Sequence, residues 1–273
     1  MTIVVLWHNA ETNQHCCAAD TRISGGGDTA TDNGPKILPV PVTCFEEMPG
    51  QRIWFPTQFR SFGFAYSGSS LSAMSAYGLA TACTQNLSGV PGLKRPVSVA
   101  AVANLFRSVA QHYILDMSSR LAINDDYSRF FFKAMLFGFC PADRAFKAYT
   151  MEPSMVAGAC QVILRELSTA AGAIHPMGSG SHVFTKLHDN REREHGDRDP
   201  IHTLQEMLAG EVQDDVGGSV QIGVSGQSGF RVLPVLAQGR EADAPTVSFL
   251  GWDVATAGDI DGYEIGYNAI GFD

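Results

Sequence analysis

The sequence predicts a layered α+β fold, and three observations support this prediction. A chain of 273 residues is long enough for one large domain, since domains contain roughly 100–200 residues. Hydrophobic residues make up 45% of the chain, which is enough for a sizeable core. Strand-like segments rich in β-branched residues come first, two long segments with helical spacing follow, and further strand-like segments come later. This order fits layers of helices and sheet within one domain.

The chain opens with a predicted β-hairpin. Residues 2–7 form an apolar run rich in β-branched side chains, residues 8–14 are polar, and residues 16–19 are small and apolar. A loop rich in glycine, aspartate and threonine follows over residues 24–34.

Strand character returns at residues 36–42, where Pro39 and Pro41 favour an edge strand or a bulge. Residues 43–60 contain glutamate, glycine and proline, and we expect a surface insertion there. The later strands are predicted at residues 62–67, 131–139, 145–151, 220–224, 230–237 and 246–250.

Helices are predicted at about residues 69–87, 98–120 and 200–209. In the second of these, apolar side chains recur every three or four residues, which is typical of a helix with one buried face. Residues 186–200 carry nine charged side chains, and we expect a solvated loop or helix end there.

Composition excludes several classes of protein. With 19 basic and 28 acidic residues, the net charge of −9 argues against binding to nucleic acid, which depends on Lys and Arg. The six cysteines are scattered without a C-x-x-C pair, which argues against a disulfide framework or a zinc site and favours a reducing, cytoplasmic compartment. No apolar run approaches the roughly 20 residues that a spanning helix needs, so we expect no membrane contact. Nothing in the sequence calls for a cofactor or a metal.

Thr2 is the first candidate catalytic residue, because only Met1 precedes it. A small second residue normally allows the initiator methionine to be removed. Threonine would then carry both a hydroxyl nucleophile and a free amine whose ordinary pKa, about 7.7–8.0, suits a general base. The dipeptide alone is common, and the simpler interpretation is a start codon followed by a strand.

Five further motifs strengthen the catalytic interpretation, in the order Ala18–Arg22, Gly34–Lys36, Phe64–Ser69, Met177–Ser181 and Asp214–Val220. Together with Thr2 they resemble the β-type subunits of the proteasome family of N-terminal nucleophile hydrolases. The bacterial proteasome homologues, including the Anbu type, are the most similar group. The resemblance reaches from Thr2 to about Val224, and it implies a four-layer αββα sandwich formed by a single domain over residues 1–273.

The resemblance also implies roles for particular residues. Thr2 would be the nucleophile and its amine the proton acceptor. Asp20 would position Lys36, whose charge eases ionisation of the threonine hydroxyl. The backbone N–H of Gly68 would stabilise the oxyanion, and Ser179 would form a hydrogen bond near the amine. The supporting aspartate is Asp214 or Asp215, with Asp215 favoured.

These roles predict a threonine peptidase or amide hydrolase that forms an acyl ester on Thr2. The resemblance implies a homo-oligomeric ring or helical stack acting on peptides or proteins, and it leaves an ATPase partner open. Two alternatives remain: a catalytically silent structural subunit that retains Met1, and an amidase for small molecules. Taken singly, Asp20 and Lys36 could instead be an ordinary turn residue and a surface lysine, and the Gly68 and Ser179 segments could be helix caps.

Overall fold

The computed structural model describes residues 2–25, 28–48, 50–90, 92–93, 95–121, 127–210, 213–237, 246–258, 260–266 and 268–271. These residues form four α-helices and sheets of five, six, three and two strands. The chain divides into two compact units. One comprises Met1–Leu38, Ala171–Val224 and Val232–Asp273, and the other comprises Pro39–Ala170 and Ser225–Arg231.

The first unit is built on a sheet with the strand order β11-β1-β2-β12-β13. Its central hairpin pairs Val4 with Ala19, and Val4 also lies opposite Met177 on the other side of β1. The bounds of these strands are β1 Val4–Asn9, β2 Gln14–Asp20, β11 Ile174–Met177, β12 Val220–Gly226 and β13 Gly229–Leu233.

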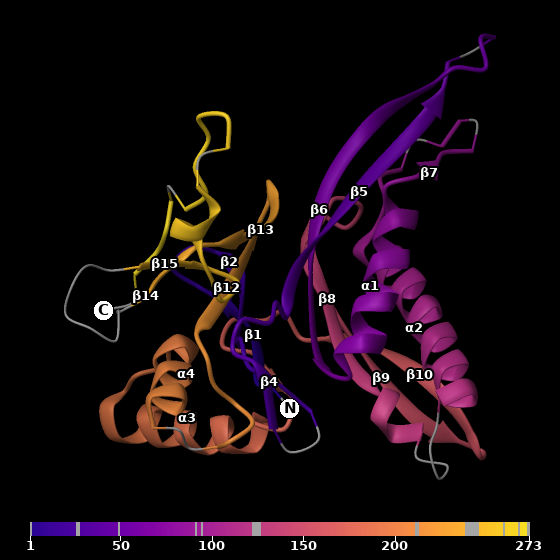
Figure 1. Cartoon of the computed structure of the whole chain (residues 1–273). Helices are drawn as coiled ribbons and strands as arrows, with labels where there is room; N and C mark the ends of the chain where they lie inside the picture. The colour runs from indigo at the N-terminus through magenta and orange to yellow at the C-terminus, as the bar shows by residue number, and fades with distance from the viewer. Residues whose placement is uncertain are drawn as a thin grey trace. The chain divides into compact units, whose positions relative to one another are not determined.

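Two helices, α3 (Ser181–His195) and α4 (Pro200–Ala209), pack on this sheet (Figure 1). The residues buried between them are almost all apolar, and their transfer from water is the main stabilising contribution. They include Ile3, Val5, Trp7, Ala18, Phe184, Ile201, Leu204, Met207, Ile222 and Val224. The last helix begins as its sequence predicts, because Asp199 caps the N–H of Ile201 and Pro200 occupies the first turn.

Shorter strands complete the first unit. The loop predicted over residues 24–34 contains a small two-stranded sheet, and a three-stranded sheet lies near the end of the chain. Their bounds are β3 Ile23–Gly25, β4 Asp28–Thr31, β14 Val235–Ala237, β15 Thr246–Phe249 and β16 Trp252–Asp253, with a 3-10 turn, η2, at Val254–Ala257.

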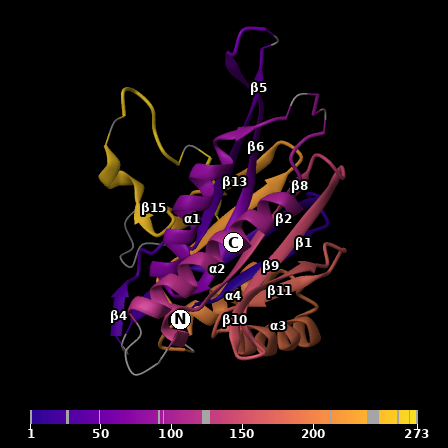
Figure 2. The same cartoon turned by 90° about the vertical axis from the view of Figure 1, so that its right-hand side faces the viewer.

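The second unit is built on a sheet with the order β10-β9-β8-β6-β5-β7. Figure 2 shows α1 (Ser70–Thr84) and α2 (Val99–Leu121) lying side by side across one face of this sheet. The strands are β5 Ile37–Glu47, β6 Trp54–Gly68, β7 Leu87–Ser88, β8 Phe132–Cys140, β9 Ala145–Val156 and β10 Ala159–Leu167, and a 3-10 turn, η1, spans Tyr127–Phe130.

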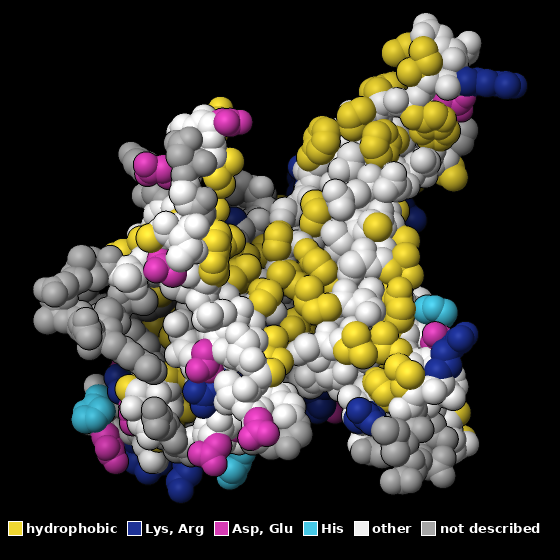
Figure 3. All heavy atoms as spheres, in the orientation of Figure 1, with side chains coloured by type: hydrophobic (Ala, Val, Ile, Leu, Met, Phe, Trp, Pro, Cys, Tyr) yellow, Lys and Arg dark blue, Asp and Glu magenta, His cyan; other side chains and the backbone are white. Residues whose placement is uncertain are grey.

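Strands β5 and β6 form a long hairpin, and the described part of residues 43–60 is its outer half. Large apolar side chains are exposed there, including Ile53, Trp54 and Phe59, and Figure 3 shows hydrophobic atoms gathered along this arm. The prolines predicted to mark an edge lie in β5. The carbonyl oxygens of Pro39 and Pro41 accept hydrogen bonds from the hydroxyls of Tyr77 and Thr84 of α1.

The prediction of a four-layer αββα sandwich is wrong. The described chain is a mixed α/β structure with four helices and several separate sheets. The additional small sheets and the long β5–β6 hairpin use strands that a simple sandwich would not contain. The prediction of one domain over residues 1–273 stays a prediction.

The charged segment at residues 186–200 is also more regular than expected. It belongs largely to α3, which runs to His195 and ends at Gly196, whose φ of 69° is left-handed. Only Phe184 and His188 of this helix are buried. Phe184 packs in the core below the helix, and His188 forms a hydrogen bond with the Thr203 hydroxyl of α4. No helix in the described part of the chain is long and apolar enough to cross a membrane.

The two adjacent cysteines of β2 are expected to resist alkylation in the folded protein. Burial, and to a smaller extent the charge of Asp199, raises the pKa of Cys16 to about 12, and burial raises the pKa of Cys17 as well. Because the thiolate is the reactive form, iodoacetamide at pH 8 should modify the partly exposed Cys44, Cys83 and Cys160 first. Peptide mapping by mass spectrometry after native and denatured labelling checks this. Early modification of Cys16 under native conditions would contradict it.

Candidate active site

The candidate site centres on a buried ion pair at the ends of two neighbouring segments. Asp20 is the last residue of β2, and Lys36 directly precedes β5. The Lys36 Nζ atom lies 2.6 Å from Asp20 Oδ1, and both side chains are almost fully buried. Such a pair is costly to desolvate unless its remaining hydrogen-bonding positions are used.

Backbone N–H groups occupy the remaining acceptor positions of the Asp20 carboxylate. Its Oδ1 accepts the N–H of Ile3 at 3.0 Å in addition to the Lys36 ammonium. Its Oδ2 accepts the N–H groups of Gly217 at 3.1 Å and Arg22 at 3.3 Å. One oxygen atom therefore joins the lysine to the residue that follows Thr2.

Burial perturbs both members of the pair. Desolvation raises the pKa of the Asp20 carboxyl, and Lys36 and the backbone donors oppose this shift. Desolvation also lowers the pKa of the Lys36 ammonium, against the attraction of Asp20 and, more weakly, Asp215. Residues whose pKa is perturbed by burial together with a specific charged partner are common at functional sites.

Thr2 lies next to this pair and is 5% exposed. Its N–H donates to Ser179 Oγ at 3.2 Å, and its carbonyl oxygen accepts the N–H of Gly180 at 3.3 Å. The Ser179 hydroxyl in turn donates to Asp215 Oδ2 at 3.2 Å. The other carboxylate oxygen of Asp215 is buried and has no hydrogen-bond partner among the described residues. A hydrogen-bonded chain thus leads from the Thr2 nitrogen to a carboxylate that can accept a further proton donor.

The geometry separates the two candidate aspartates. Asp215 faces Ser179, whereas Asp214 is exposed and contributes its carbonyl oxygen to Arg22 Nη1 at 3.0 Å. Arg22 also forms an ion pair with Asp32, whose Oδ1 lies 2.7 Å from its Nε. Arg22 therefore ties the segment before β12 to the end of β2.

Two glycines allow this segment to approach so closely. A Cβ atom on Gly217 would lie 2.4 Å from Arg22 Cζ, and one on Gly218 would lie 2.4 Å from Thr21 Oγ1. Gly218 also has a φ of +78°, which side-chain-bearing residues rarely adopt. The Thr21 hydroxyl accepts the N–H of Ser219 at 2.7 Å.

Sequence reasoning missed one residue that touches the pair. Gln221 of β12 forms hydrogen bonds to the backbone of both Asp20 and Lys36. The available signal was a single polar residue between Val220 and Ile222 in an otherwise apolar strand. Arg22 and Thr21 were noted only as part of a motif.

Gly68 belongs to the second unit, whereas the other predicted site residues belong to the first. It ends β6 with a φ of +99°, and a Cβ atom there would lie 2.7 Å from the Phe131 carbonyl oxygen. Glycine is thus required for the turn into α1, where Ser69 forms the N-cap. Its role in binding an oxyanion stays a prediction. Met1 lies outside the described residues.

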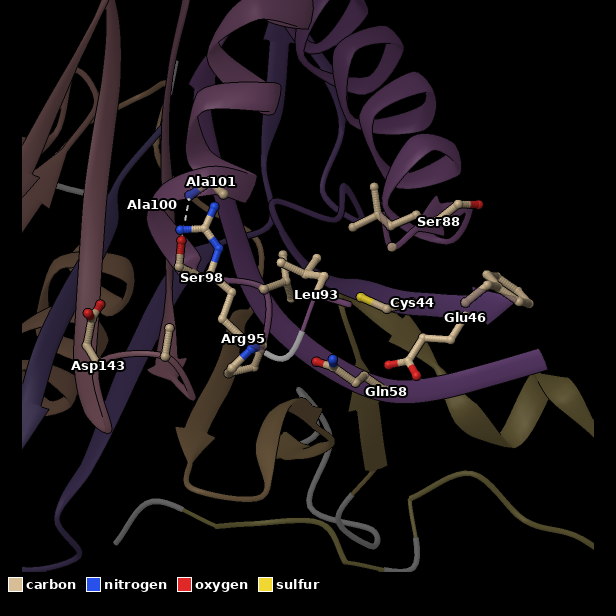
Figure 4. Close-up of a pocket in the computed structure, with 16 residues that line it drawn as sticks. Cys44, Glu46, Gln58, Ser88, Leu93, Arg95, Ser98, Ala100, Ala101 and Asp143 are labelled. Carbon is tan, nitrogen blue, oxygen red and sulfur yellow. Dashed lines mark hydrogen bonds between the residues drawn. The ribbon is translucent and has the colours of Figure 1, made fainter. Parts of the chain in front are cut away.

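A separate cavity of about 420 Å³ lies in the second unit (Figure 4). Its lining comes from β5, β6, β7 and the segment that leads into α2, and includes Cys44, Glu46, Gln58, Arg95 and Asp143. Burial raises the pKa of the Cys44 thiol, and the described lining contains no histidine to activate it. This cavity therefore has no evident nucleophile and base.

Among the described residues, no three His, Cys, Asp or Glu side chains are grouped as a metal site would require. The chemistry available around Thr2 is that of the hydroxyls of Thr2 and Ser179, the main-chain nitrogen of Thr2, a lysine and two carboxylates. Neither the protein-family models nor the curated proteins contain a match to this chain. Its function is therefore inferred from the geometry of these residues.

Proposed function

We propose that this protein is a threonine-type hydrolase of peptide or amide bonds in which Thr2 is the nucleophile. The peptide bond before Thr2 must first be cut, so that the Thr2 nitrogen becomes a free amine. The observation that carries the proposal is that Ser179 and Asp20 accept the N–H groups of Thr2 and Ile3, while Lys36 pairs with the same oxygen atom of Asp20. These residues are distant in sequence, and the resemblance to N-terminal nucleophile hydrolases implies the same set around a catalytic threonine: a cation, a carboxylate and a polar partner for the amine.

In the proposed first step, the Thr2 oxygen attacks the substrate carbonyl carbon and the hydroxyl proton passes to the Thr2 amine. The nearby Lys36 ammonium lowers the cost of developing negative charge on the oxygen. The tetrahedral intermediate then collapses, the bond from carbon to nitrogen breaks, and the leaving amine takes the proton. An ester on Thr2 remains.

In the second step, the Thr2 amine removes a proton from water, and the resulting hydroxide attacks the ester carbon. The ester bond breaks, the carboxylic acid is released, and the proton returns to the threonine oxygen. Ser179 and Asp215 form the hydrogen-bonded chain that orients the amine through both steps.

Intact-protein mass spectrometry of untagged protein, before and after incubation with a β-lactone, tests this proposal. Ring opening of the lactone by the Thr2 hydroxyl forms an ester and adds the full mass of one reagent molecule. We expect a protein lacking Met1 that gains one adduct, which peptide mapping places on Thr2. The Thr2→Ala variant should gain none.

Retention of Met1 together with absence of an adduct would overturn the proposal and favour a catalytically silent structural protein. If Thr2 reacts, hydrolysis of fluorogenic peptides compared with small aliphatic amides separates a peptidase from a small-molecule amidase. Homo-oligomer formation is part of the proposal, and light scattering of the untagged protein tests it.

A further inference from the structure

Gln221 is a buried polar residue in the middle of β12, with 1% of its surface exposed. Its neighbours Val220, Ile222 and Val224 pack toward α3 and α4. Because side chains alternate along a strand, Gln221 points to the opposite face of the sheet. A buried amide on that face destabilises the fold unless its hydrogen bonds are satisfied.

All four hydrogen-bonding positions of this amide are used, and all four partners are backbone groups. Gln221 Oε1 accepts the N–H of Lys36 at 2.9 Å and the N–H of Ile37 at 3.1 Å. Gln221 Nε2 donates to the carbonyl oxygens of Asp20 at 2.9 Å and Gly34 at 3.1 Å. A glutamine amide has two donors and two acceptor positions, so none is left over.

These partners are the two segments that carry the ion pair. Asp20 ends β2, Lys36 precedes β5, and the chain between them makes an excursion through β3 and β4. One planar amide therefore fixes the spacing of both backbones directly behind their charged side chains. No other side chain in the described part of the chain is shown bonding to the backbone of both Asp20 and Lys36.

We infer that Gln221 is a positioning residue that sets the geometry of the Asp20–Lys36 pair and thereby the reactivity of Thr2. The link to Thr2 rests on the proposed function. The effect on the ion pair does not, since it follows from the four hydrogen bonds alone. A displacement of about 1 Å in catalytic groups lowers rates by about 100-fold, so small changes in this spacing matter.

Gln111 offers a matched control for the loss of a glutamine amide. It lies on α2 in the second unit, donates to the carbonyl oxygen of Cys160 at 2.9 Å and accepts the N–H of Val162 at 2.6 Å. It too joins backbone segments, but it has no contact with the ion pair. Both Gln221→Leu and Gln111→Leu therefore remove an amide that bridges backbone segments. Only Gln221→Leu removes one that is bonded to the backbone of Asp20 and Lys36.

The first readout is the rate at which the β-lactone acylates Thr2, measured per folded molecule across a range of pH. We expect Gln221→Leu to lower this rate by about 100-fold and to raise the pH midpoint of the reaction by about half a unit. The midpoint should rise because an ammonium held near the Thr2 amine lowers the pKa of that amine, and a displaced Lys36 does so less. Gln111→Leu should leave the midpoint unchanged.

The charged groups that act on Lys36 are Asp20 of β2, Arg22 two residues after it, and Asp215 before β12. All three are present in both variants, so a changed midpoint reports their arrangement rather than their number. A folded Gln221→Leu protein with the midpoint and rate of Gln111→Leu would overturn the inference.

A second variant and a second readout cover the case in which Gln221→Leu does not fold. Gln221→Asn keeps an amide and adds no charge, but its side chain is one methylene shorter and cannot reach all four backbone partners. The ¹⁵Nζ resonance of Lys36, one of only five lysines, can be followed by NMR with labelled lysine. We expect its pKa to fall in Gln221→Asn, because a larger separation from Asp20 weakens the attraction that favours the ammonium, and to be unchanged in Gln111→Leu.

This measurement separates the two proposals. If wild-type Thr2 never reacts but the Lys36 resonance responds to substitution of Gln221, the proposed function fails and the positioning role stands. If Thr2 reacts and neither its pH midpoint nor the Lys36 pKa responds, the proposed function stands and the positioning role fails.

Discussion

Replacing Lys36 by methionine is expected to lower the free energy of unfolding by about 3–5 kcal/mol, because it leaves the Asp20 carboxylate buried without its cation. The backbone N–H groups of Ile3, Arg22 and Gly217 still bond that carboxylate, but they carry no full charge. Urea denaturation followed by circular dichroism measures the change. If the proposed function holds, the same substitution should also slow acylation of Thr2 by about 100-fold or more, since the cation proposed to ease ionisation of the Thr2 hydroxyl is lost.

The double variant Asp20→Asn with Lys36→Met separates these two effects. Removing both charges should restore most of the stability, since two neutral side chains carry no desolvation cost of that size. The acylation rate should stay low. A double variant that recovered the rate together with the stability would contradict a catalytic role for the pair.

Lys133→Met is the matched control for loss of a lysine from an ion pair. Lys133 pairs with Glu152, but their side chains are 49% and 38% exposed. Water screens such a pair, so we expect a change of less than about 1 kcal/mol and an unchanged acylation rate.

Replacing Gly218 by alanine is expected to have the second largest effect, a loss of about 3 kcal/mol. The left-handed φ of +78° accounts for about 1–2 kcal/mol. The new Cβ atom would also lie 2.7 Å from the backbone oxygen of Asp32, which cannot rotate away as a side chain can. Overpacking of this kind adds about 1–3 kcal/mol.

The strain at Gly218 should also reach the site, because the segment that moves carries Asp215. We expect the acylation rate of Thr2 to fall by about tenfold or more, since a displaced carboxylate no longer orients Ser179. Gly172→Ala is the control: its φ is +79°, and no atom lies within 4 Å of the added Cβ. Equal losses of stability and rate in the two variants would refute the steric argument.

Local elements were predictable where local signals agree. The helix at Pro200–Ala209 was predicted at its observed bounds, because Asp199, Pro200 and Gly210 mark its ends. The helices α1 and α2 and the strands β8 and β9 were likewise predicted within a few residues.

Elements whose own residues carry a weak pattern were not predictable. Strand β10 carries Arg165 and Glu166 and shows little apolar alternation, and its pairing with the preceding strand β9 determines its conformation. Residues 186–200 were predicted to be a loop or helix end because they carry nine charged side chains, although residues 186–195 belong to α3. The prediction of a four-layer sandwich was wrong for a related reason. The number of strands in each sheet depends on which strands pair, and the hydrophobic periodicity of the sequence does not encode this pairing.

The residues of the candidate site were also only partly predictable from the sequence. Thr2, Asp20, Lys36 and Ser179 were found from motifs in order, and the structure brings these four together with Asp215. Gln221 was missed because its partners lie 185 and 201 residues earlier in the chain. Nothing in the local sequence of a buried strand tells which backbone its one amide will meet.

The large sequence separation within the site has a consequence for synthesis. Ribosomes add roughly 5–20 residues per second, so about 10–40 s separate the appearance of Lys36 from that of Gln221, which lies 185 residues later. During that interval Asp20 and Lys36 lack the strand that fixes them, and Ser179 and Asp215 have yet to reach Thr2 for most of it. Under the proposed function, the growing chain therefore carries Thr2 before the residues that would activate it are made, and hydrolysis would begin only once the chain is nearly complete.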